Sequence, residues 1–402
     1  MRWTYNACVE SILAGRNGYQ LAPLRQFVNN DAVLVHARPW LTEVPFDVRY
    51  EAVRDLLKAR AAYQAKQAVN KTGFELKFRS RRDLTQESIV VHKKHWGTHG
   101  RGLYASVFSS AVMKSSGQDP LPKLLPADSR LIRDRLNRWY LCVPTPLPDR
   151  TRSAPAHKVE AIDTGVRTFL TCYSPTAGLT EVGVQDYRRL ERLDHHLDQL
   201  RSRMDTATAR ARKSMRRAAL RMEGRIRNLV DDIHKKAALH LLTTYQEILL
   251  PAFSSSAMIK KPVASGKYRK LGKSTVRAML HWAHYRFRQR LVEASARFPG
   301  SKVTLVTEEF TSRTCGVCGT VADKYSDKQF HCLNCGLKCD RDLLGARNIL
   351  IKRLSELQQQ AAGDTTVASF WDLTPGPEPC VPSDTAESCK IEYREKSSQT
   401  SI

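Results

Sequence analysis

Two Cys-x-x-Cys pairs lie close together in the chain, and their spacing is that of a metal site. The first pair is Cys315 and Cys318 in TCGVCG, and the second is Cys332 and Cys335 in HCLNCG. Four thiolates presented by two such turns match the tetrahedral coordination that zinc prefers in proteins. We therefore expect one structural zinc ion in a zinc ribbon. A pair of disulfides or four unrelated core thiols is the alternative.

Acidic residues flank these cysteines at the ends of expected strands and helices. Asp163 ends the apolar run VEAID, where an unpaired carboxylate would be costly. Glu308 and Glu309 end the strand-like run TLVTEE. Asp342 opens a helix, two residues after Asp340. Since phosphodiester hydrolysis by the two-metal route needs carboxylates holding two Mg²⁺ ions about 3.5–4 Å apart, these acids are candidates for a magnesium nuclease site.

Each acid also has an ordinary structural explanation. Asp163 could begin a hairpin turn. Either glutamate could be a solvated charge at a strand end, and either of the later aspartates could cap a helix. Singly these signals are weak. Together, with a cysteine knuckle between the second and the third, they become specific.

The chain is strongly basic, with 65 Lys and Arg against 40 Asp and Glu over 402 residues and a formal net charge of +25. Such a surface attracts polyanions, and nucleic acid is the default partner because neutralised phosphates release condensed counterions. An incidentally basic protein is the alternative. No apolar run is long enough for a membrane span, and no apolar signal segment opens the chain. We therefore expect no membrane partner and a compartment in which thiols stay reduced.

The positive charge concentrates in 77–82, 201–227 and 259–270, and 281–290 adds aromatic residues to basic ones. Basic helices with occasional aromatics suit contact with nucleic acid, although solvated helix faces and ordinary core packing are equally open. The candidate contact residues are Arg79, Arg81, Arg82, Arg212, Lys213, Arg216, Arg217, Lys260, Lys261 and Arg286.

Hydrophobic periodicity divides the chain in two. Residues 1–157 mix short strand-like runs with one amphipathic helix at about 46–70 and end in a Pro-rich linker, which predicts a β-rich body with a helical insert. The rest alternates strands with helices, and carboxylates at strand ends in such a pattern describe an RNase H-like α/β domain. Its expected elements are a hairpin at 158–173, a strand at 179–184, two antiparallel basic helices at about 188–243, buried strands at 246–253 and 302–309, a helix at 274–298 and a last helix from about Arg341.

The residues that carry this chemistry resemble those of a known family. TnpB proteins of insertion sequences, and their eukaryotic and viral relatives the Fanzor proteins, have split RuvC nuclease motifs and a zinc ribbon. Type V CRISPR effector nucleases are more distant kin. Four segments of this chain are similar to those motifs: 163-DTGVRTFLT-171, 308-EEFTSRTCGVCG-319, 332-CLNCG-336 and 340-DRDLLGARNI-349. The matches cover about residues 158 to 352.

The resemblance implies an RNA-guided DNA endonuclease. In that family a noncoding guide RNA pairs with double-stranded target DNA, and one RuvC site cuts both strands with Mg²⁺. The protein would then be a monomer in a ribonucleoprotein, nuclear in a eukaryotic host and cytoplasmic otherwise. Asp163 matches the first catalytic aspartate, and Asp342 matches the last better than Asp340 does.

One position departs from the family pattern. Most TnpB proteins carry the catalytic glutamate after the central strand, where this chain has Pro251. Fanzor proteins and some TnpB relatives place an acid just before the first cysteine pair instead, which favours Glu308, then Glu309, and favours Fanzor over the bacterial proteins. Since side chains alternate along a strand, only one of these glutamates should face the metals.

The resemblance and the patterns together predict a multidomain chain of mixed α/β and β content, with an RNase H-like (RuvC) nuclease domain. The expected parts are a β-barrel wedge domain with a helical recognition insert (1–157), a first RuvC part with its basic helical insert (158–311), the zinc ribbon (312–338), the last RuvC helix (339–361) and a disordered tail (362–402). Two other functions stay open. One is a catalytically inactive, domesticated RNA- or DNA-binding protein, and the other is a guide-independent nuclease or transposase.

Overall fold

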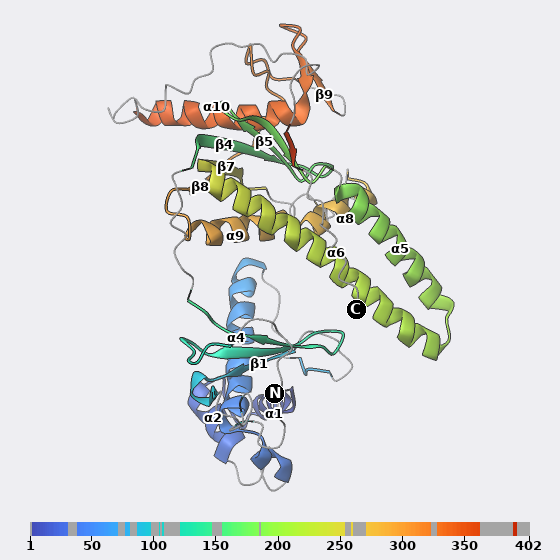
Figure 1. Ribbon diagram of the computed structural model, residues 1–402. Coiled ribbons are helices and arrows are strands. Elements are labelled where there is room, and N and C mark those ends of the chain that lie inside the picture. The colour runs from blue at the N-terminus through green and yellow to red at the C-terminus, as the bar shows by residue number, and fades with distance from the viewer. Residues whose placement is uncertain are drawn as a thin grey trace. The chain divides into compact units, whose positions relative to one another are not determined.

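The chain folds as two compact units, Met1–Leu147 and Pro148–Ile402 (Figure 1). Within the described residues no helix has the length and apolar character that a membrane span requires. The computed structural model describes residues 2–30, 38–70, 77–80, 87–97, 104, 107, 121–146, 155–184, 186–253, 259, 271–322, 328–361 and 389–391.

The first unit joins a group of helices to a small sheet. Its elements are α1 (Arg2–Leu13), α2 (Leu21–Asn30), the 3-10 helix η1 (Pro39–Glu43), α4 (Phe46–Asn70), β1 (Glu87–Val91), the 3-10 helix η2 (Lys93–His95), β2 (Ser129–Arg133) and β3 (Trp139–Cys142). The helices α1, α2 and α4 pack together around Val9, Leu24 and Leu56. The strands form an antiparallel sheet in the order β1-β2-β3.

This unit corrects part of the sequence-based expectation. The helix expected at about 46–70 is confirmed by α4, but residues 2–30 form the helices α1 and α2 where a β-rich body was expected. The reason is that their apolar residues recur at helical spacing and face α4, as Val9 and Leu24 do. Of the strand-like run 31–40 expected in this unit, residues 31–37 lie outside the described residues, and Pro39 and Trp40 begin η1. The described strands form an open sheet, and they show no closed barrel.

The second unit is built on a six-stranded sheet in the order β11-β6-β5-β4-β7-β8. Strands β4, β7 and β8 run parallel, β5 and β6 return antiparallel to β4, and β11 pairs parallel with β6. Its elements are β4 (His157–Thr164), β5 (Leu170–Ser174), β6 (Gly178–Val182), α5 (Asp186–Thr206), α6 (Ala209–Thr244), β7 (Tyr245–Pro251), α8 (Lys273–Trp282), α9 (His284–Ser295), β8 (Lys302–Val306), β9 (Gln329–His331), β10 (Lys338–Asp340), α10 (Arg341–Ala361) and β11 (Cys389–Ile391).

Helices cover both faces of this sheet (Figure 1). On one face α10 packs Ile349 and Leu350 against Val159 and Leu249. On the other face α6, α8 and α9 enclose a larger apolar core. Covering on both sides explains why β4 is buried without interruption from Val159 to Ile162.

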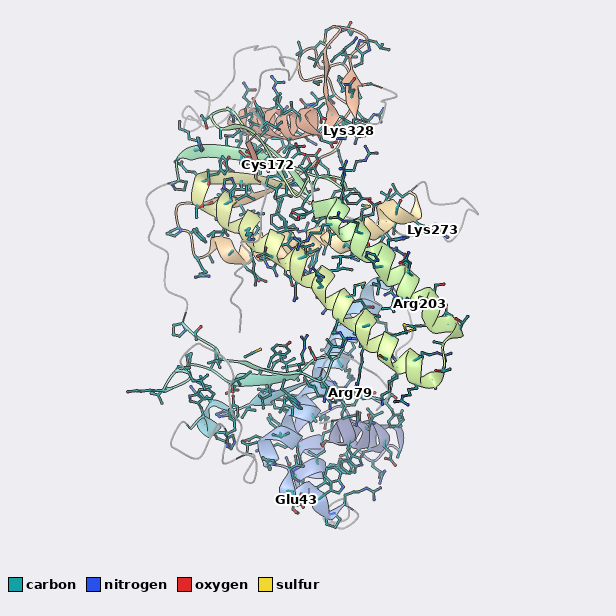
Figure 2. All side chains as sticks on the ribbon, turned by 45° about the vertical axis from the view of Figure 1, so that its right-hand side comes forward. Glu43, Arg79, Cys172, Arg203, Lys273 and Lys328 are labelled. Atoms are coloured by element: carbon teal, nitrogen blue, oxygen red, sulfur yellow. The ribbon has the colours of Figure 1, made fainter. Side chains whose placement is uncertain are left out.

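The two predicted basic helices are confirmed as the antiparallel pair α5 and α6. Leucines of α5 such as Leu190 and Leu197 pack on Ile226 and Val230 of α6, while the charged faces point outward. Thr208 caps α6, because its Oγ1 accepts a hydrogen bond from the Ala211 N–H at 3.4 Å. Figure 2 labels Arg203 near the far end of this helical pair.

The single helix expected at 274–298 is two helices, α8 and α9. They meet at Ala283, which has a left-handed φ of 46°. The Trp282 carbonyl accepts a hydrogen bond from His234 Nε2 (2.8 Å), and the Trp282 indole N–H donates to the Val166 carbonyl (2.7 Å). These contacts hold the backbone at the break, where the helical ladder is interrupted.

Of the predicted tail 362–402, the structure describes only Cys389–Ile391, which form β11 beside β6.

Candidate carboxylate and zinc sites

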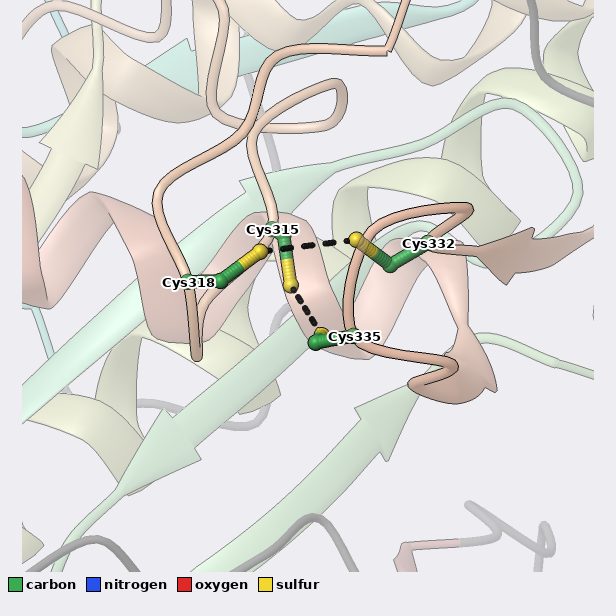
Figure 3. A group of neighbouring side chains, drawn as sticks. All are labelled: Cys315, Cys318, Cys332 and Cys335. Carbon is green, nitrogen blue, oxygen red and sulfur yellow. Dashed lines mark hydrogen bonds between the residues drawn. The ribbon is translucent and has the colours of Figure 1, made fainter.

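The four cysteines of the predicted zinc ribbon converge. Their sulfur atoms all lie within 4.8 Å of one another, and Sγ–Sγ distances of 3.5 Å join Cys315 to Cys335 and Cys318 to Cys332 (Figure 3). Four sulfurs about 2.3 Å from a tetrahedral zinc ion lie roughly 3.8 Å apart. The donor set and its spacing therefore fit one zinc ion.

Backbone hydrogen bonds shape each half of this site. The Gly319 N–H donates to the Cys315 carbonyl (3.0 Å), and the Gly336 N–H donates to the Cys332 carbonyl (2.9 Å). Both glycines have a left-handed φ near +73° to +74°, which a residue with a Cβ adopts poorly. Each pair of cysteines is thus held in a tight turn that aims both sulfurs at one point.

The ionisation of the thiols also suits a metal. A side-chain hydrogen bond with Thr320, whose Oγ1 lies 3.2 Å from Cys318 Sγ, lowers the pKa of Cys318 to about 5. Burial raises the pKa of the Cys315 thiol to about 12. A bound zinc ion deprotonates coordinating thiols outright, so zinc and the buried thiolate would stabilise each other.

The sheet brings the first predicted acid to the carboxyl edge of its parallel strands. Pairing aligns Ala161 of β4 with Leu249 of β7, and Leu249 with Thr304 of β8. Two residues further along these strands come Asp163 and Pro251. Asp163 therefore lies at the end of a central strand, where sites in open α/β sheets form.

Glu308 is placed differently from the expectation. Strand β8 ends at Val306, so Glu308 and Glu309 lie in the following turn, and the argument from strand alternation does not apply to them. The Thr311 N–H (3.3 Å) and Thr311 Oγ1 (2.9 Å) both donate to the Glu308 carbonyl. In this turn Glu308 is half-buried and Glu309 is exposed.

The last two acids lie at the start of α10. Asp340 Oδ1 accepts hydrogen bonds from the N–H groups of Asp342 (2.8 Å) and Leu343 (3.2 Å), which makes Asp340 the N-cap of this helix. Asp342 is half-buried, and its Oδ1 lies 3.2 Å from the Arg341 guanidinium. A Cβ added to Gly345 would meet Asp163 Oδ2 at 2.6 Å, so α10 presses closely against the strand that carries Asp163.

Electrostatics shows that the three acids interact. Burial and, after it, the negative charges of Asp342 and Glu308 raise the pKa of Asp163 to about 7, while Arg341 opposes them. Burial also raises the pKa of Glu308. Unlike the four cysteines, these carboxylates do not all place an oxygen within 4.8 Å of one another. The partly buried carboxylates offer hard oxygen ligands, which is the kind of ligand that Mg²⁺ prefers. The Arg341 guanidinium lies beside them and would not bind the metal.

Three residues around these acids were not singled out by sequence reasoning, although they lie in the quoted segment 340–349. They are Arg341, Gly345 and Asn348. Asn348 Nδ2 donates to the carbonyls of Thr311 and Thr314, each at 2.7 Å. Spacing alone does not reveal such roles, because they depend on which face of α10 meets the turn after β8.

The predicted nucleic-acid contacts fall into three groups. Lys213, Arg216 and Arg217 are exposed on α6 and form no ion pair with any described residue. Arg81, Arg82, Lys260 and Lys261 lie outside the described residues.

The third group is engaged within the protein. Arg79 stacks 3.9 Å from the Tyr5 ring, and Arg286 lies 3.2 Å from Asp231. Arg212 donates to carbonyls at the end of α5, including that of Met204 at 3.1 Å.

The aromatic residues of 281–290 divide between core and surface. Trp282 and Phe287 belong to the apolar core, whereas Tyr285 is 55% exposed. Core packing therefore accounts for two of the three.

The structure thus combines a zinc-ribbon-like cluster of four cysteines with a sheet covered by helices, in which Asp163 lies at the carboxyl end of the parallel strand β4. A family model described as "Cas12f1-like, TNB domain" matches residues 284–349. A putative transposase of Paramecium bursaria Chlorella virus 1 is 26% identical, over 92% of this chain and 85% of that protein. A putative transposase of Acanthamoeba polyphaga mimivirus is 29% identical, over 52% of this chain but only 42% of that protein.

A CRISPR-associated endodeoxyribonuclease Cas12f1 of Sulfoacidibacillus thermotolerans is 22% identical, over 68% of this chain and 69% of that protein. The solved structure of a Cas12f1–sgRNA–target DNA complex matches over 87% of this chain and 80% of that chain, at 11% identity and a TM-score of 0.48. These similarities support a TnpB/Cas12-type family for this chain.

Proposed function

We propose that this protein is an RNA-guided DNA endonuclease that cuts target DNA by two-metal-ion hydrolysis at one RuvC-type site. The observation that carries the proposal is the packing of α10 on Asp163, where a Cβ on Gly345 would meet Asp163 Oδ2 at 2.6 Å and Asp342 lies three residues earlier on the same helix. The negative charges of Asp342 and Glu308 raise the pKa of Asp163 accordingly. Like charges gathered in a partly buried place are costly unless cations neutralise them. A pair of Mg²⁺ ions is the natural partner of such a cluster.

In this proposal Asp163, Glu308 and Asp342 hold the two Mg²⁺ ions. Magnesium at such a site supplies an activated water and stabilises the leaving oxygen of the phosphodiester. The pKa of about 7 means that Asp163 is largely ionised only somewhat above neutral pH unless a cation is present. Arg341 lies beside the acids and limits their mutual repulsion.

The location of Glu308 supports a Fanzor-like assignment of the catalytic glutamate. Pro251 ends β7 and offers no carboxylate, whereas Glu308 lies two residues beyond Val306, the β8 partner of Pro251. From there Glu308 influences Asp163 across the end of β7. The lack of an acid at the carboxyl end of β7 therefore does not argue for an inactive protein.

The basic pair α5 and α6 supports a guide-binding role. An RNA–DNA heteroduplex is held through its backbone and A-form shape, which requires exposed positive charge and no base-specific contacts. Lys213, Arg216 and Arg217 offer such charge. We extend the proposal to a noncoding guide RNA and double-stranded target DNA as partners, and to a nuclear ribonucleoprotein in a eukaryotic host or a cytoplasmic one otherwise. The domain assignments proposed from the resemblance, including the wedge barrel at 1–157 and the ribbon at 312–338, go with it.

The test is a cleavage assay on a target plasmid, with the RNA that co-purifies with the protein first identified by sequencing. We expect cutting that requires both this RNA and Mg²⁺. Asp163→Asn and Glu308→Gln should each reduce the rate by at least about 100-fold, since each removes a metal ligand. Glu309→Gln is the matched control, because Glu309 is the exposed neighbour of Glu308 and should leave the rate unchanged.

The outcomes separate the alternatives. Cutting without any RNA would indicate a guide-independent nuclease or transposase. Tight binding of one defined RNA without Mg²⁺-dependent cutting would indicate a domesticated binding protein. Equal cutting by the original chain and Asp163→Asn would remove Asp163 from the mechanism.

A further inference from the structure

Asn348 is a buried polar residue on α10, only 6% exposed, that reaches out of its helix. Its Nδ2 donates two hydrogen bonds of 2.7 Å, to the carbonyls of Thr311 and Thr314. Both carbonyls belong to the loop that runs from Glu308 to Cys315. One side chain thus ties α10 to the loop that carries a candidate metal ligand at one end and a candidate zinc ligand at the other.

The loop itself is a connected series of turns. The Glu308 carbonyl accepts from the Thr311 N–H and Oγ1, and the Phe310 carbonyl accepts from the N–H of Arg313 (2.9 Å) and of Thr314 (3.0 Å). Phe310 has a left-handed φ of 66°, a conformation that non-glycine residues adopt only when their surroundings impose it. Because Thr311 donates two hydrogen bonds to the Glu308 carbonyl, holding Thr311 in place also holds the backbone of Glu308.

Neighbouring residues of α10 complete the connection. Gly345 is packed against Asp163, and Arg347 Nη1 donates to the Gly316 carbonyl inside the first cysteine turn (3.0 Å). A Cβ on Gly316 would lie 2.9 Å from Asn348 Oδ1, so this turn sits directly on Asn348. Within little more than one helical turn, α10 contacts Asp163, the Glu308 loop and the zinc ribbon.

We propose that Asn348 is a positioning residue that holds Glu308 in register with Asp163 and Asp342, and through which the zinc ribbon controls the affinity of the carboxylate site for divalent cations. The inference rests on the proposed function, because it takes these three acids as the ligands. Groups that orient metal ligands through hydrogen bonds typically change metal affinity 10–100-fold when they are removed. Asn348 orients Glu308 indirectly: Asn348 donates a hydrogen bond to the Thr311 carbonyl, and the Thr311 N–H donates to the Glu308 carbonyl.

The experiment measures Mn²⁺ binding by the full-length, zinc-loaded chain without nucleic acid, from the electron paramagnetic resonance signal of free Mn²⁺. Asn348→Leu keeps the number and branching of the side-chain heavy atoms and removes both N–H donors. We expect the Mn²⁺ dissociation constant to rise about 10- to 100-fold while the zinc content stays at one ion per chain. The matched control is Lys352→Gln on the same helix, whose exposed ammonium donates only a long hydrogen bond to the Glu309 carbonyl (3.4 Å) and should leave the affinity unchanged.

Thr311→Val tests the same contacts from the loop side. Thr311 is buried and valine has nearly its shape, so only the Oγ1 hydrogen bond to the Glu308 carbonyl is lost. The Mn²⁺ dissociation constant should rise in the same direction, by a smaller factor. This variant keeps the test decisive even where Asn348→Leu folds poorly.

The link to zinc is tested by combining changes. Cys335→Ser removes one exposed zinc ligand and should itself weaken Mn²⁺ binding. Combined with Asn348→Leu it should add little further loss, because both changes act through one connection and such effects are not additive. Fully additive losses would contradict control of the acid site by zinc through Asn348.

Unchanged Mn²⁺ affinity in zinc-loaded Asn348→Leu and Thr311→Val would overturn the role of Asn348. Loss of zinc from Asn348→Leu would do so too, since Asn348 would then support the ribbon and not Glu308. Asp163→Asn separates this failure from that of the proposed function. If Asp163→Asn still binds Mn²⁺ normally, the proposed carboxylate site does not bind the metal. If only Asp163→Asn loses Mn²⁺ binding, the carboxylate site is supported and only the role of Asn348 fails.

Discussion

The zinc site and the carboxylate site of this protein are assembled in opposite ways. The four cysteines come from one short segment, and their sulfurs gather within 4.8 Å through local turns. The acids come from β4, from the turn after β8 and from the start of α10, and they meet because strands pair in one register and α10 packs on Asp163. A local site depends on its metal, whereas a distributed site depends on the whole sheet.

The two sites also respond differently to the loss of charge. The ribbon buries few apolar residues, chiefly Phe330 beside Cys315 and against Leu344 of α10, so it would depend on zinc for much of its stability. The acid cluster lowers the stability of the metal-free fold, because its buried like charges repel one another. Removing a ligand should therefore destabilise the first site and stabilise the second.

The largest effect is expected from replacing the two buried zinc ligands, Cys315→Ser with Cys332→Ser. Structural zinc sites of this type fold only with metal, so the ribbon should unfold and release the Glu308 loop from α10. We expect loss of bound zinc, proteolysis within 312–338 and loss of cleavage even at high Mg²⁺. Zinc content, limited proteolysis and the plasmid assay measure these three. Cleavage that survives would mean that the ribbon does not support the acids.

Asp163→Asn should abolish cleavage but make the metal-free protein more stable. The pKa of Asp163 is raised to about 7 from an ordinary 3.8, so the folded state is disfavoured wherever the unfolded chain has already released this proton. This penalty is absent below about pH 4, grows between pH 4 and 7, and is complete above pH 7. At pH 8 the melting temperature should rise by about 5 °C or more, and the difference should vanish near pH 4. Calorimetry across this range checks it, and a variant less stable than the original at pH 8 would contradict it.

Gly345→Ala should disturb the acid site and leave the zinc site alone. The new Cβ would meet Asp163 Oδ2 at 2.6 Å, and this carboxylate can turn away only by leaving its position near the other acids. We expect cleavage to fall about 10- to 100-fold with zinc content unchanged. Gly224→Ala on α6 is the matched control, because a Cβ there meets no atom within 4 Å. Equal activity of the two variants would show that the position of Asp163 is not critical.

The same contrast explains what the sequence could predict. Cysteine spacing is a local signal, and it led directly to the four sulfurs that converge. The helix pair at 188–243, the strands β4 to β8 and α10 followed from periodicity, whereas β9, β10 and β11 were not predicted. What failed depended on tertiary contacts: the break at Ala283 is held by His234 and Val166, and the end of β8 at Val306 is set by the turn that Asn348 fixes.

Charge alone was a poorer guide to single residues. Arg79, Arg212 and Arg286 looked like nucleic-acid contacts, yet each has partners inside its own unit. The sequence does not distinguish an arginine that caps a helix from one that faces solvent, because the difference depends on how the chain packs. The exposed residues of α6 are therefore the better candidates.

The smallest effect on cleavage is expected from Glu160→Gln. Glu160 lies three residues before Asp163 on β4, so its side chain is on the opposite face of the sheet from the acid site. It is completely buried, and its interaction with the Tyr245 side chain only partly offsets the cost of burying its charge. Burial raises its pKa from an ordinary 4.5 to about 8.

Between these two pH values the unfolded chain releases the proton of Glu160 and the folded chain retains it, so stability falls by about 1.4 kcal/mol per pH unit. The loss levels off above about pH 8. Glutamine has no such titration, so the advantage of Glu160→Gln in melting temperature should grow from pH 5 to pH 8 and then stay constant, with cleavage at neutral pH within about twofold of the original. A pH-independent difference would mean that Glu160 is not protonated in the fold. A large loss of cleavage would mean that the two faces of β4 are coupled, and that the acid site depends on the core beneath the sheet as well as on α10.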